Sequence, residues 1–268
     1  KFLWNDMNKF RHPKNVAASG GIVVVLAFVL GVLIYVGFRT FIAKAYDGES
    51  MGIFATVTTI LILGLVGVID DLWGWKSKGM AKRWKLLLAF FASIPLVVIN
   101  AGVSAMNVPF LGTVNFGLLY PLLLIPVGIV GAANAFNFLA GMNALEASQG
   151  IIILSFLSFV AYLTGSAWLA VVGMTMVFSL LGFYIFNKFP ARVFPGDSMT
   201  LSVGALIAIM SILGNFEKIA VFVFMPYLIE PVLKLRGKLE KQSFGRPNKD
   251  GSLELPNEKI YGLTHFAI

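Results

Sequence analysis

Long apolar runs separated by short polar stretches follow one another along the whole chain. A membrane-spanning helix needs about 20 consecutive apolar residues. Backbone groups in hydrocarbon find no water to bond, and the runs do not alternate like barrel strands, so each long run is predicted to be helical. The pattern predicts an all-α, polytopic transmembrane helical bundle that forms a single integral membrane domain over residues 1–268. The eight predicted spans are 20–42, 51–70, 86–104, 117–137, 149–165, 167–186, 198–215 and 217–235, and a ninth is expected to begin near Ile260.

The amino-acid composition also indicates a membrane protein. Of the 268 residues, 58% are hydrophobic and 13% are charged, whereas soluble domains carry about 25% charged residues. Cysteine is absent and only two histidines are present, which excludes a disulfide framework or a thiolate nucleophile and disfavours a zinc or copper site. Because the sequence starts at Lys1 and stops in the apolar stretch 266–268, we expect a fragment, with helices missing at one or both ends.

Positive charge is distributed unevenly between the two sides of the predicted bundle. The chain has 21 Lys and Arg residues and a net charge of +8. If the predicted spans alternate in direction, 18 of the 21 basic residues lie on one side, and Arg39, Lys44 and Lys218 lie on the other. Cytoplasmic loops are enriched in Lys and Arg. The basic side is therefore predicted to be cytoplasmic, and the charge indicates membrane loops rather than a nucleic-acid partner.

Two adjacent carboxylates, Asp70 and Asp71, end the second apolar run. A basic stretch follows them and finishes at Lys85, at the mouth of the third run. Neighbouring carboxylates repel one another, so a bound cation or a shifted proton affinity is expected. The pair is interpreted either as a solvated helix end with a stop signal or as a polar site at the membrane surface. Lys85 is expected either to extend toward the interface or to hold a phosphate.

A second polar cluster, NAFNFLAGMNALEASQG at 134–150, follows the fourth run on the same predicted side. Asn134, Asn137 and Gly141 have the spacing of one helix face, and Asn143 and Glu146 continue the polar line. Buried amides need partners. The cluster therefore predicts either a hydrogen-bond network between helices or the binding site of a polar ligand.

A third cluster, FNKFPARVFPGDSMT at 186–200, contains a turn at Pro195 and Gly196. Asp197 follows this turn, where it is interpreted either as the N-cap of a helix that starts near Ser198 or as a metal ligand. The polar stretch 236–259 is interpreted either as a linker or as a cytoplasmic substrate-recognition loop that contains Arg246. His265 follows this loop, where an isolated histidine is more often structural.

These clusters predict a common site on the cytoplasmic side. Magnesium takes oxygen ligands and is usually held by one or two carboxylates together with substrate phosphates. Carboxylates and amides are present, and basic loops would attract an anionic substrate. The residues therefore predict a magnesium-dependent site for a phosphate-bearing substrate.

Three blocks of sequence extend this interpretation: VIDDLWGWKSKGMAKRWKLLL, NAFNFLAGMNALEASQG and VFPGDSMT. In these blocks, and in their order and spacing over nearly the whole chain, the sequence resembles the polyprenyl-phosphate N-acetylhexosamine-1-phosphate transferases. Within that family it is most similar to the UDP-GlcNAc:dolichyl-phosphate GlcNAc-phosphotransferases, archaeal relatives included. The resemblance implies a fold of about ten membrane helices with a cytoplasmic active-site cleft.

The resemblance also implies an activity, the transfer of a sugar-1-phosphate, GlcNAc-1-phosphate, from a UDP-sugar to a polyprenyl or dolichyl phosphate. UMP is released, and the reaction is the first step of lipid-linked glycan assembly. Mg²⁺ is the implied cofactor, with Mn²⁺ as a substitute. The implied location is the cell membrane of an archaeon or bacterium, or the endoplasmic reticulum of a eukaryote. A homodimer is the assembly considered.

By motif position, the resemblance implies a role for individual residues. Asp70 and Asp71 match an acidic pair that either takes part in catalysis or organises the lipid phosphate and metal, and Lys85 matches a phosphate-contacting lysine. Asn137 and Asp197 match metal ligands. The substrate-binding residues that the resemblance implies are Gly141 and Asn143 at the uridine, Phe194 stacking on uracil, and Arg246 in the sugar loop. Asn134, Glu146 and His265 are further candidate substrate-binding residues.

This sequence departs from the family pattern at three places. Gly74 stands where the family often has Asn or Asp, and Ala144 stands in a block that usually reads NGLE. The sugar loop retains Arg246 between Gly245 and Pro247, without the clustered basic element of eukaryotic relatives. The identity of the sugar is therefore less constrained by the sequence than the type of reaction.

Two alternatives to this activity remain at this stage. One is a transferase of the same fold that uses another UDP-sugar or a peptidoglycan precursor. The other is an ion-coupled secondary transporter, which would place its acids near the bilayer midplane between related halves. CDP-alcohol phosphotransferases are set aside because their longer aspartate-rich signature is missing.

Overall fold

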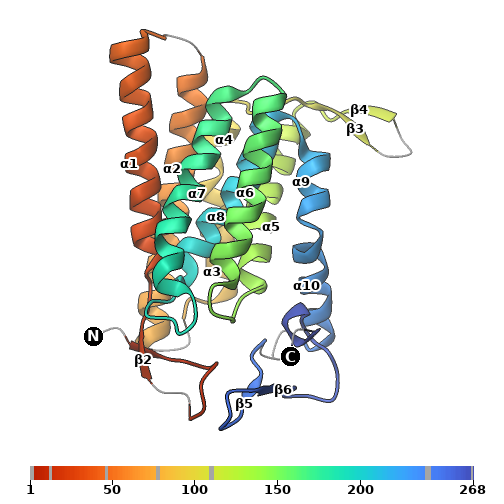
Figure 1. Cartoon of the computed structure of the whole chain (residues 1–268). Coiled ribbons are helices and arrows are strands. Elements are labelled where there is room, and N and C mark those ends of the chain that lie inside the picture. Colours follow the sequence, from red (N-terminus) through yellow and green to blue (C-terminus); the bar gives the residue numbers. More distant parts are fainter. Residues whose placement is uncertain are drawn as a thin grey trace.

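The computed structural model describes residues 3–11, 14–45, 48–76, 79–108, 112–238, 243–266 and 268. It forms an upright bundle of helices with small two-stranded sheets at its ends (Figure 1). Within the described residues, six helical segments are long and apolar enough to cross a membrane. They are α1 (Gly21–Phe38) with the π-helical turn η1 (Arg39–Ala43), α2 (Glu49–Lys76), η2 (Tyr120–Leu124) with α5 (Ile125–Phe138), α6 (Leu145–Leu163), α7 (Ala167–Asn187) and α8 (Gly196–Gly214).

The prediction of an all-α membrane bundle is confirmed, but the predicted count of eight to nine spans exceeds the six found among the described residues. The run 86–104 forms two short helices, α3 (Lys82–Ala92) and α4 (Ile94–Val98), and the run 217–235 forms α9 (Glu217–Val223) and α10 (Met225–Arg236). Pro95 and Pro226 lie in the first turn of the second helix of each pair. Because proline has no N–H for a helical hydrogen bond, each run divides at this point.

The ninth span predicted near Ile260 is wrong for the residues described. The chain there forms only a short 3₁₀ turn, η3 (Leu263–Phe266), with Thr264 and His265 buried. Within this turn Leu263 packs against the core of the bundle, whereas Phe266 is exposed.

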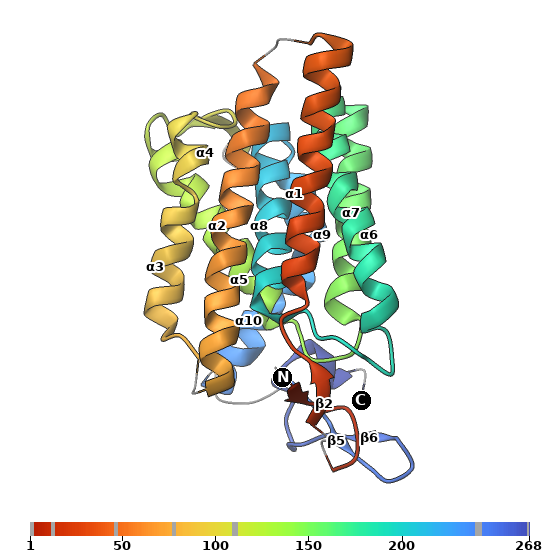
Figure 2. The same ribbon diagram turned by 90° about the vertical axis from the view of Figure 1, so that its left-hand side faces the viewer.

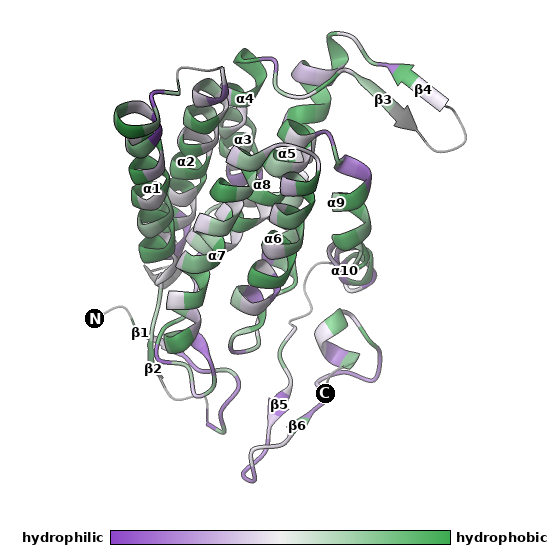
Figure 3. Ribbon diagram, turned by 45° about the horizontal axis from the view of Figure 1, so that its top comes forward, coloured by the Kyte–Doolittle hydropathy of each residue, from purple (hydrophilic) through white to green (hydrophobic). Residues whose placement is uncertain are grey.

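Helix α8 lies at the centre of the bundle (Figures 1 and 2). All its residues from Ser198 to Ile212 are buried, and it packs most extensively against α2 and α5. Glycine allows close approach here: a Cβ at Gly67 of α2 would lie 2.3 Å from the Ser198 backbone nitrogen. The outer helices instead expose large apolar side chains, as the lipid-facing surface of a membrane protein requires. Figure 3 shows that the ribbons of these helices are coloured mostly as hydrophobic.

Short antiparallel strand pairs lie beyond the helix ends. β1 (Leu3–Asn5) pairs with β2 (Lys14–Ala17), and β5 (Arg246–Pro247) pairs with β6 (Leu253–Glu254), both at the end of the bundle that holds the two termini. The third pair, β3 (Ala105–Val108) with β4 (Gly112–Asn115), lies at the opposite end (Figure 1). The acid pair and the other predicted site residues lie toward the end that carries β1, β2, β5 and β6.

Candidate active site

Lys85 connects the ends of three helices that are far apart in the sequence. From the first turn of α3, its Nζ lies 2.5 Å from Oδ2 of Asp70 in α2 and also forms an ion pair with Asp197 in α8. Asp70 Oδ1 accepts a hydrogen bond from the Met80 N–H at 2.5 Å. Burial opposes the charge on the Lys85 ammonium, but the carboxylates of Asp197 and Asp70 outweigh this effect and raise its pKa. The structure thus brings three of the predicted residues into direct contact.

Asp71 contacts the start of α8 through the turn at Gly196. Its Oδ1 accepts a hydrogen bond from the Asp197 N–H at 2.9 Å. Gly196 has φ +67°, and a Cβ there would lie 2.2 Å from Asp71 Oδ2, so both the backbone conformation and the available space require glycine. Pro195 is the N-cap of α8, and Asp197 lies in the first turn. The interpretation of Asp197 as an N-cap is therefore wrong.

Asn137, in the last turn of α5, meets α8 one helical turn beyond Asp197. Thr200 Oγ1 donates a hydrogen bond to Asn137 Oδ1 at 3.1 Å. Sequence reasoning missed Thr200, although it belongs to the VFPGDSMT block. Its spacing of three residues from Asp197 on a helix was a signal that could have found it.

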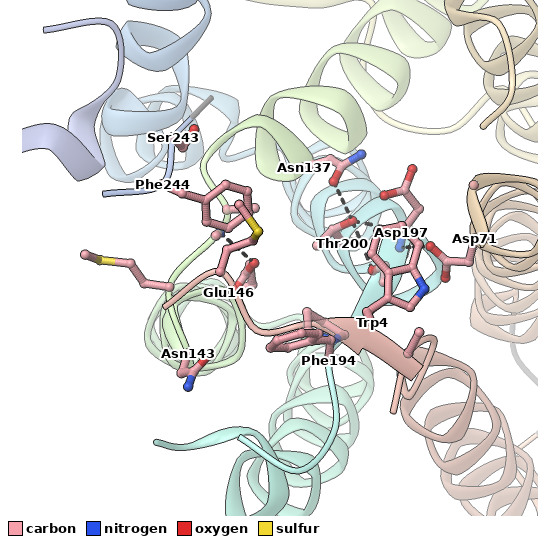
Figure 4. Close-up of a pocket in the computed structure, with 18 of the residues that line it drawn as sticks. Trp4, Asp71, Asn137, Asn143, Glu146, Phe194, Asp197, Thr200, Ser243 and Phe244 are labelled. Carbon is pink, nitrogen blue, oxygen red and sulfur yellow. Dashed lines mark hydrogen bonds between the residues drawn. The ribbon is translucent and has the colours of Figure 1, made fainter. Parts of the chain in front are cut away.

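A cavity of about 690 Å³ opens beside these helix ends. Figure 4 shows Asp71 and Asp197 at one side of the cavity and Glu146 and Phe244 at the other. Seven of the predicted residues line it: Asp71, Asn137, Gly141, Asn143, Glu146, Phe194 and Asp197. Polar residues from two distant blocks and from the acid pair thus share one hollow at this end of the bundle.

The loop between α5 and α6 forms one wall of the cavity. Helix α5 ends at Phe138, so Gly141 is not on a helix face with Asn134 and Asn137, and that prediction is wrong. Gly141 has φ +124°, and its N–H donates a hydrogen bond to Glu146 Oε1 at 3.2 Å. The helical periodicity therefore stops before Gly141, and Gly141 adopts a backbone conformation that other residues rarely adopt.

Ala144, the departure from the family's NGLE block, adopts a left-handed conformation with φ +69° and ψ −5°. A non-glycine residue in this conformation loses about 1–2 kcal/mol. Asn187 holds the loop in place, because its Oδ1 accepts the Ala144 N–H at 3.1 Å while its Nδ2 donates to the Val193 carbonyl at 2.8 Å.

Replacing Ala144 with glycine is expected to leave the free energy of unfolding unchanged or to raise it by up to about 1 kcal/mol, because relief of backbone strain exceeds the entropy that glycine adds to the unfolded chain. Chemical unfolding in detergent would measure the difference. Ala147→Gly, at a buried position inside α6, is the matched control and should lower stability by about 1 kcal/mol. Equal destabilisation by both substitutions would contradict the assigned strain.

A second wall comes from the N-terminal strand pair, which sequence reasoning did not place at the site. Asn8 Nδ2 donates hydrogen bonds to the Gly141 carbonyl at 3.1 Å and to Asn143 Oδ1 at 3.3 Å. The Phe194 N–H donates to the Ala17 carbonyl at 2.8 Å, which joins β2 to the turn before α8. In the sequence, the basic residues before the first span predict only on which side of the membrane the N-terminal segment lies. Pairing between distant segments leaves no periodic pattern in the sequence, so the position of this strand pair could not be predicted.

The Trp4 side chain packs beside the unusual glycine at position 74. A Cβ at Gly74 would lie 3.6 Å from the Trp4 ring, and both residues line the cavity. Trp4 lies beside Asp71 in Figure 4. The indole therefore occupies the space beside the acid pair into which a longer side chain at position 74 would project.

Three predicted substrate-binding residues are not among the residues that line this cavity in the described part of the chain. Asn134 donates a hydrogen bond back to the Val130 carbonyl within α5 at 2.8 Å. Arg246 is exposed on β5. His265 is buried in η3, and its Nδ1 accepts the Tyr261 N–H at 3.2 Å. Their roles in substrate binding stay predictions. Of the predicted loop 236–259, residues 239–242 lie outside the described residues.

The donor groups at the cavity suit a hard cation. Among the described residues, no group of three or more His, Cys, Asp or Glu side chains is arranged to hold a metal ion. The oxygen donors where α2, α5 and α8 meet at the cavity include the carboxylates of Asp71 and Asp197 and the amide of Asn137. Magnesium commonly takes one or two protein carboxylates and completes its shell with water and substrate phosphate. This donor set fits magnesium better than a metal that needs nitrogen or sulfur ligands.

Comparison with known proteins identifies the family. Residues 53–215 match the model described as "Glycosyl transferase family 4". The chain belongs to glycosyl transferase family 4. This match covers the acid pair and all three motif blocks, so the resemblance to the polyprenyl-phosphate N-acetylhexosamine-1-phosphate transferases is confirmed. The prediction of an enzyme, a glycosyl-1-phosphate transferase integral to the membrane, is confirmed as well.

Individual relatives of this glycosyl transferase family 4 chain cover most of its length. It is 34% identical over 271 residues to a protein of Saccharolobus solfataricus named "Putative UDP-N-acetylglucosamine--dolichyl-phosphate N-acetylglucosaminephosphotransferase", covering all of this chain and 80% of the relative. A Sulfolobus acidocaldarius protein of the same name is 34% identical over 273 residues, covering all of this chain and 79% of the relative. A "Phospho-N-acetylmuramoyl-pentapeptide-transferase" of Clostridium perfringens is 30% identical over 217 residues, covering 79% and 65% of the two chains.

Proposed function

We propose that this enzyme transfers GlcNAc-1-phosphate from UDP-GlcNAc to a polyprenyl or dolichyl phosphate and releases UMP, with magnesium as cofactor. The names of the two archaeal relatives support this choice of sugar and lipid. The basic end of the bundle, which carries the cavity, would face the cytoplasm. A transporter is disfavoured by membership of a transferase family and by the position of the acids at helix ends.

The contact of Lys85 with both Asp70 and Asp197 is the observation that carries the proposal. A cation surrounded by carboxylates at the edge of a polar cavity suits a reaction in which phosphate groups must be held and oriented. Phosphoryl transfer depends mainly on positioning and on electrostatic stabilisation of the transferred group. The lysine and the acids supply charge of both signs where a diphosphate and a lipid phosphate would meet.

In this reaction an oxygen of the lipid phosphate attacks the β-phosphorus of the UDP-sugar. The bond from that phosphorus to the bridging oxygen breaks, and UMP leaves with the bridging oxygen. When bound at Asn137 and Asp197, magnesium would neutralise the diphosphate charge. A phosphate monoester has a second pKa of about 6, so the nucleophile is already mostly ionised near neutral pH. Asp71, held against the start of α8, would orient groups at the reacting centre.

Incubation of the purified protein with labelled UDP-GlcNAc, dolichyl phosphate and Mg²⁺ tests the proposal. We expect a lipid-linked GlcNAc diphosphate and an equal amount of UMP, and we expect EDTA to reduce the rate at least about a hundredfold. Added Mg²⁺ or Mn²⁺ should restore it. Full activity in EDTA would contradict the requirement for a metal ion. Release of UMP without a lipid-linked product would contradict the assignment of dolichyl phosphate as the acceptor.

A peptidoglycan precursor is the second candidate donor, because the Clostridium perfringens relative carries the name of a muramoyl-pentapeptide transferase. The same assay with the UDP-linked muramoyl pentapeptide separates the two. We expect transfer from UDP-GlcNAc to be faster, since the two archaeal relatives match the whole chain. Faster transfer from the pentapeptide donor would reverse the assignment.

A further inference from the structure

Glu230 of α10 is a fully buried carboxylate outside the cavity lining. Its Oε2 accepts a hydrogen bond from the Leu263 N–H at 2.6 Å. A Cβ at Gly262 would lie 2.9 Å from Glu230 Oε1, so glycine lets this stretch of backbone pack directly on the carboxylate. A buried charge is costly unless it is paired and hydrogen-bonded, and here its backbone partner lies at the end of the polar C-terminal stretch.

The stretch anchored by Glu230 reaches the cavity through a second hydrogen bond. Thr264 Oγ1, one residue beyond Leu263, donates to the Ser243 carbonyl at 2.9 Å, and the bond is buried. Ser243 and Phe244 line the cavity. The Phe244 ring packs on Gly141, whose Cβ position would lie 3.0 Å from the ring. Two hydrogen bonds therefore connect a buried acid on α10 to an aromatic wall of the cavity.

Lys234, one helical turn after Glu230, reaches the cavity by another route. Its Nζ lies 3.6 Å from Glu230 Oε1 and donates a hydrogen bond of 2.6 Å to the Phe138 carbonyl at the end of α5. Lys234 also lines the cavity. The carboxylate thus balances the charge of a lysine that holds the α5–α6 loop, on the same side of the cavity as Phe244.

We propose that Glu230 is a positioning residue that sets the nucleotide-sugar side of the cavity by anchoring the wall formed by Ser243 and Phe244. The inference rests on the proposed function. Figure 4 shows Phe244 and Glu146 across the cavity from Asp71 and Asp197, where the acid pair would receive the lipid phosphate. Loss of the anchor should therefore weaken binding of the UDP-sugar and leave binding of the lipid acceptor and the chemical step nearly unchanged.

Glu230→Ala and Glu230→Gln test this inference in the full chain. Loss of a hydrogen bond to a charged group corresponds to about a tenfold change in an equilibrium constant. We expect Glu230→Ala to raise KM for UDP-GlcNAc at least about tenfold, with kcat and KM for dolichyl phosphate within about twofold of the wild type. Glu230→Gln keeps an acceptor for the Leu263 N–H and should recover most of the affinity. Glu258→Gln, at an exposed acid in the same stretch, controls for the loss of charge.

Phe244→Ala shows whether Glu230 acts through this wall. Glu230 and Phe244 would belong to one unit. The double variant, Glu230→Ala with Phe244→Ala, should therefore raise KM for UDP-GlcNAc no more than the single variant that has the larger effect. Fully additive effects would assign Glu230 a role separate from Phe244 and overturn the inference. An unchanged KM for UDP-GlcNAc in Glu230→Ala, or equal increases in KM for both substrates, would overturn it as well.

Hydrogen exchange gives a readout that does not depend on the reaction. Glu230→Ala should accelerate exchange at residues 262–266 while α6 and α8 exchange as in the wild type, whereas Glu258→Gln should change neither. Unchanged hydrogen exchange at residues 262–266 would refute the anchoring role of Glu230, even if the wild-type enzyme is active. If the wild type transfers nothing from UDP-GlcNAc, the proposed function fails, while faster exchange in Glu230→Ala would still support the anchor.

Discussion

Asp197→Asn is expected to reduce the transfer rate about a hundred- to a thousandfold while the bundle stays folded. The substitution keeps the size of the side chain, and an amide oxygen can still accept a hydrogen bond from Lys85. It removes the negative charge that pairs with Lys85 and that would hold the cation. Loss of one preorganised electrostatic group at a reacting centre typically has an effect of this size.

The measurement is the rate of lipid-linked product formation at saturating Mg²⁺, together with the unfolding temperature in detergent. Asp250→Asn is the matched control, because Asp250 is an exposed aspartate bonded to Ser252 in the turn between β5 and β6. It makes the same chemical change outside the cavity lining and should leave the transfer rate within about twofold of the wild type. Full activity of Asp197→Asn would remove Asp197 from the site.

Gly67→Ala is expected to have the largest effect on stability, at least about 3 kcal/mol of destabilisation. The added Cβ would lie 2.3 Å from the Ser198 nitrogen and 2.4 Å from its Cα. These are backbone atoms of the enclosed helix α8, so no side chain can rotate away. The clash would separate α2 from α8 close to the contact between Asp71 and Asp197, and activity should fall with stability.

Gly37→Ala is the control for this prediction. Gly37 also lies in a membrane-spanning helix, α1, but a Cβ there would meet nothing within 4 Å. Alanine has the higher helix propensity, so stability should be unchanged or slightly increased. Thermal unfolding of the two variants in the same detergent measures the difference. Similar unfolding temperatures for both would show that α2 and α8 are not packed as closely as described.

Much of the fold follows from the length of the apolar runs. The first, second and fourth to seventh predicted spans each correspond to a helix long enough to cross a membrane. The third and eighth are broken because a proline at position 95 or 226 interrupts the hydrogen bonds of the helix, while hydropathy is insensitive to this interruption. Apolarity predicts where the chain is buried in lipid or protein, and backbone chemistry decides whether one helix continues.

The candidate site could be predicted where its residues are unusual for their position. Charged groups at the ends of apolar runs, Asp70, Asp71, Lys85 and Asp197, stand out in the sequence, and the structure brings them together. Thr200 was missed because a threonine within an apolar helix is ordinary. Its importance appears only once Asn137 is seen opposite it.

The remaining walls of the cavity could not be predicted because they depend on pairings between distant segments. Trp4 and Asn8 reach the cavity through β1 and β2, whose position depends on backbone bonds to the turn before α8. Phe244 depends on the buried carboxylate of Glu230 and on Thr264. Each of these contacts links segments that no local pattern relates. Arg246, chosen from the predicted sugar loop, and His265, which follows that loop, lie outside the cavity lining.

The enclosure of α8 has a consequence for how the protein is made. Its Ser198, Thr200, Ser202 and Ser211 are buried against other helices, and polar side chains of this kind lower the tendency of an isolated segment to leave the translocon for lipid. Among the described residues it is also the last of the six long helices in chain order. The other five long helices are therefore synthesised before α8, and the contacts of Asp197 with Lys85 and Asp71 can form only after α8 has been made.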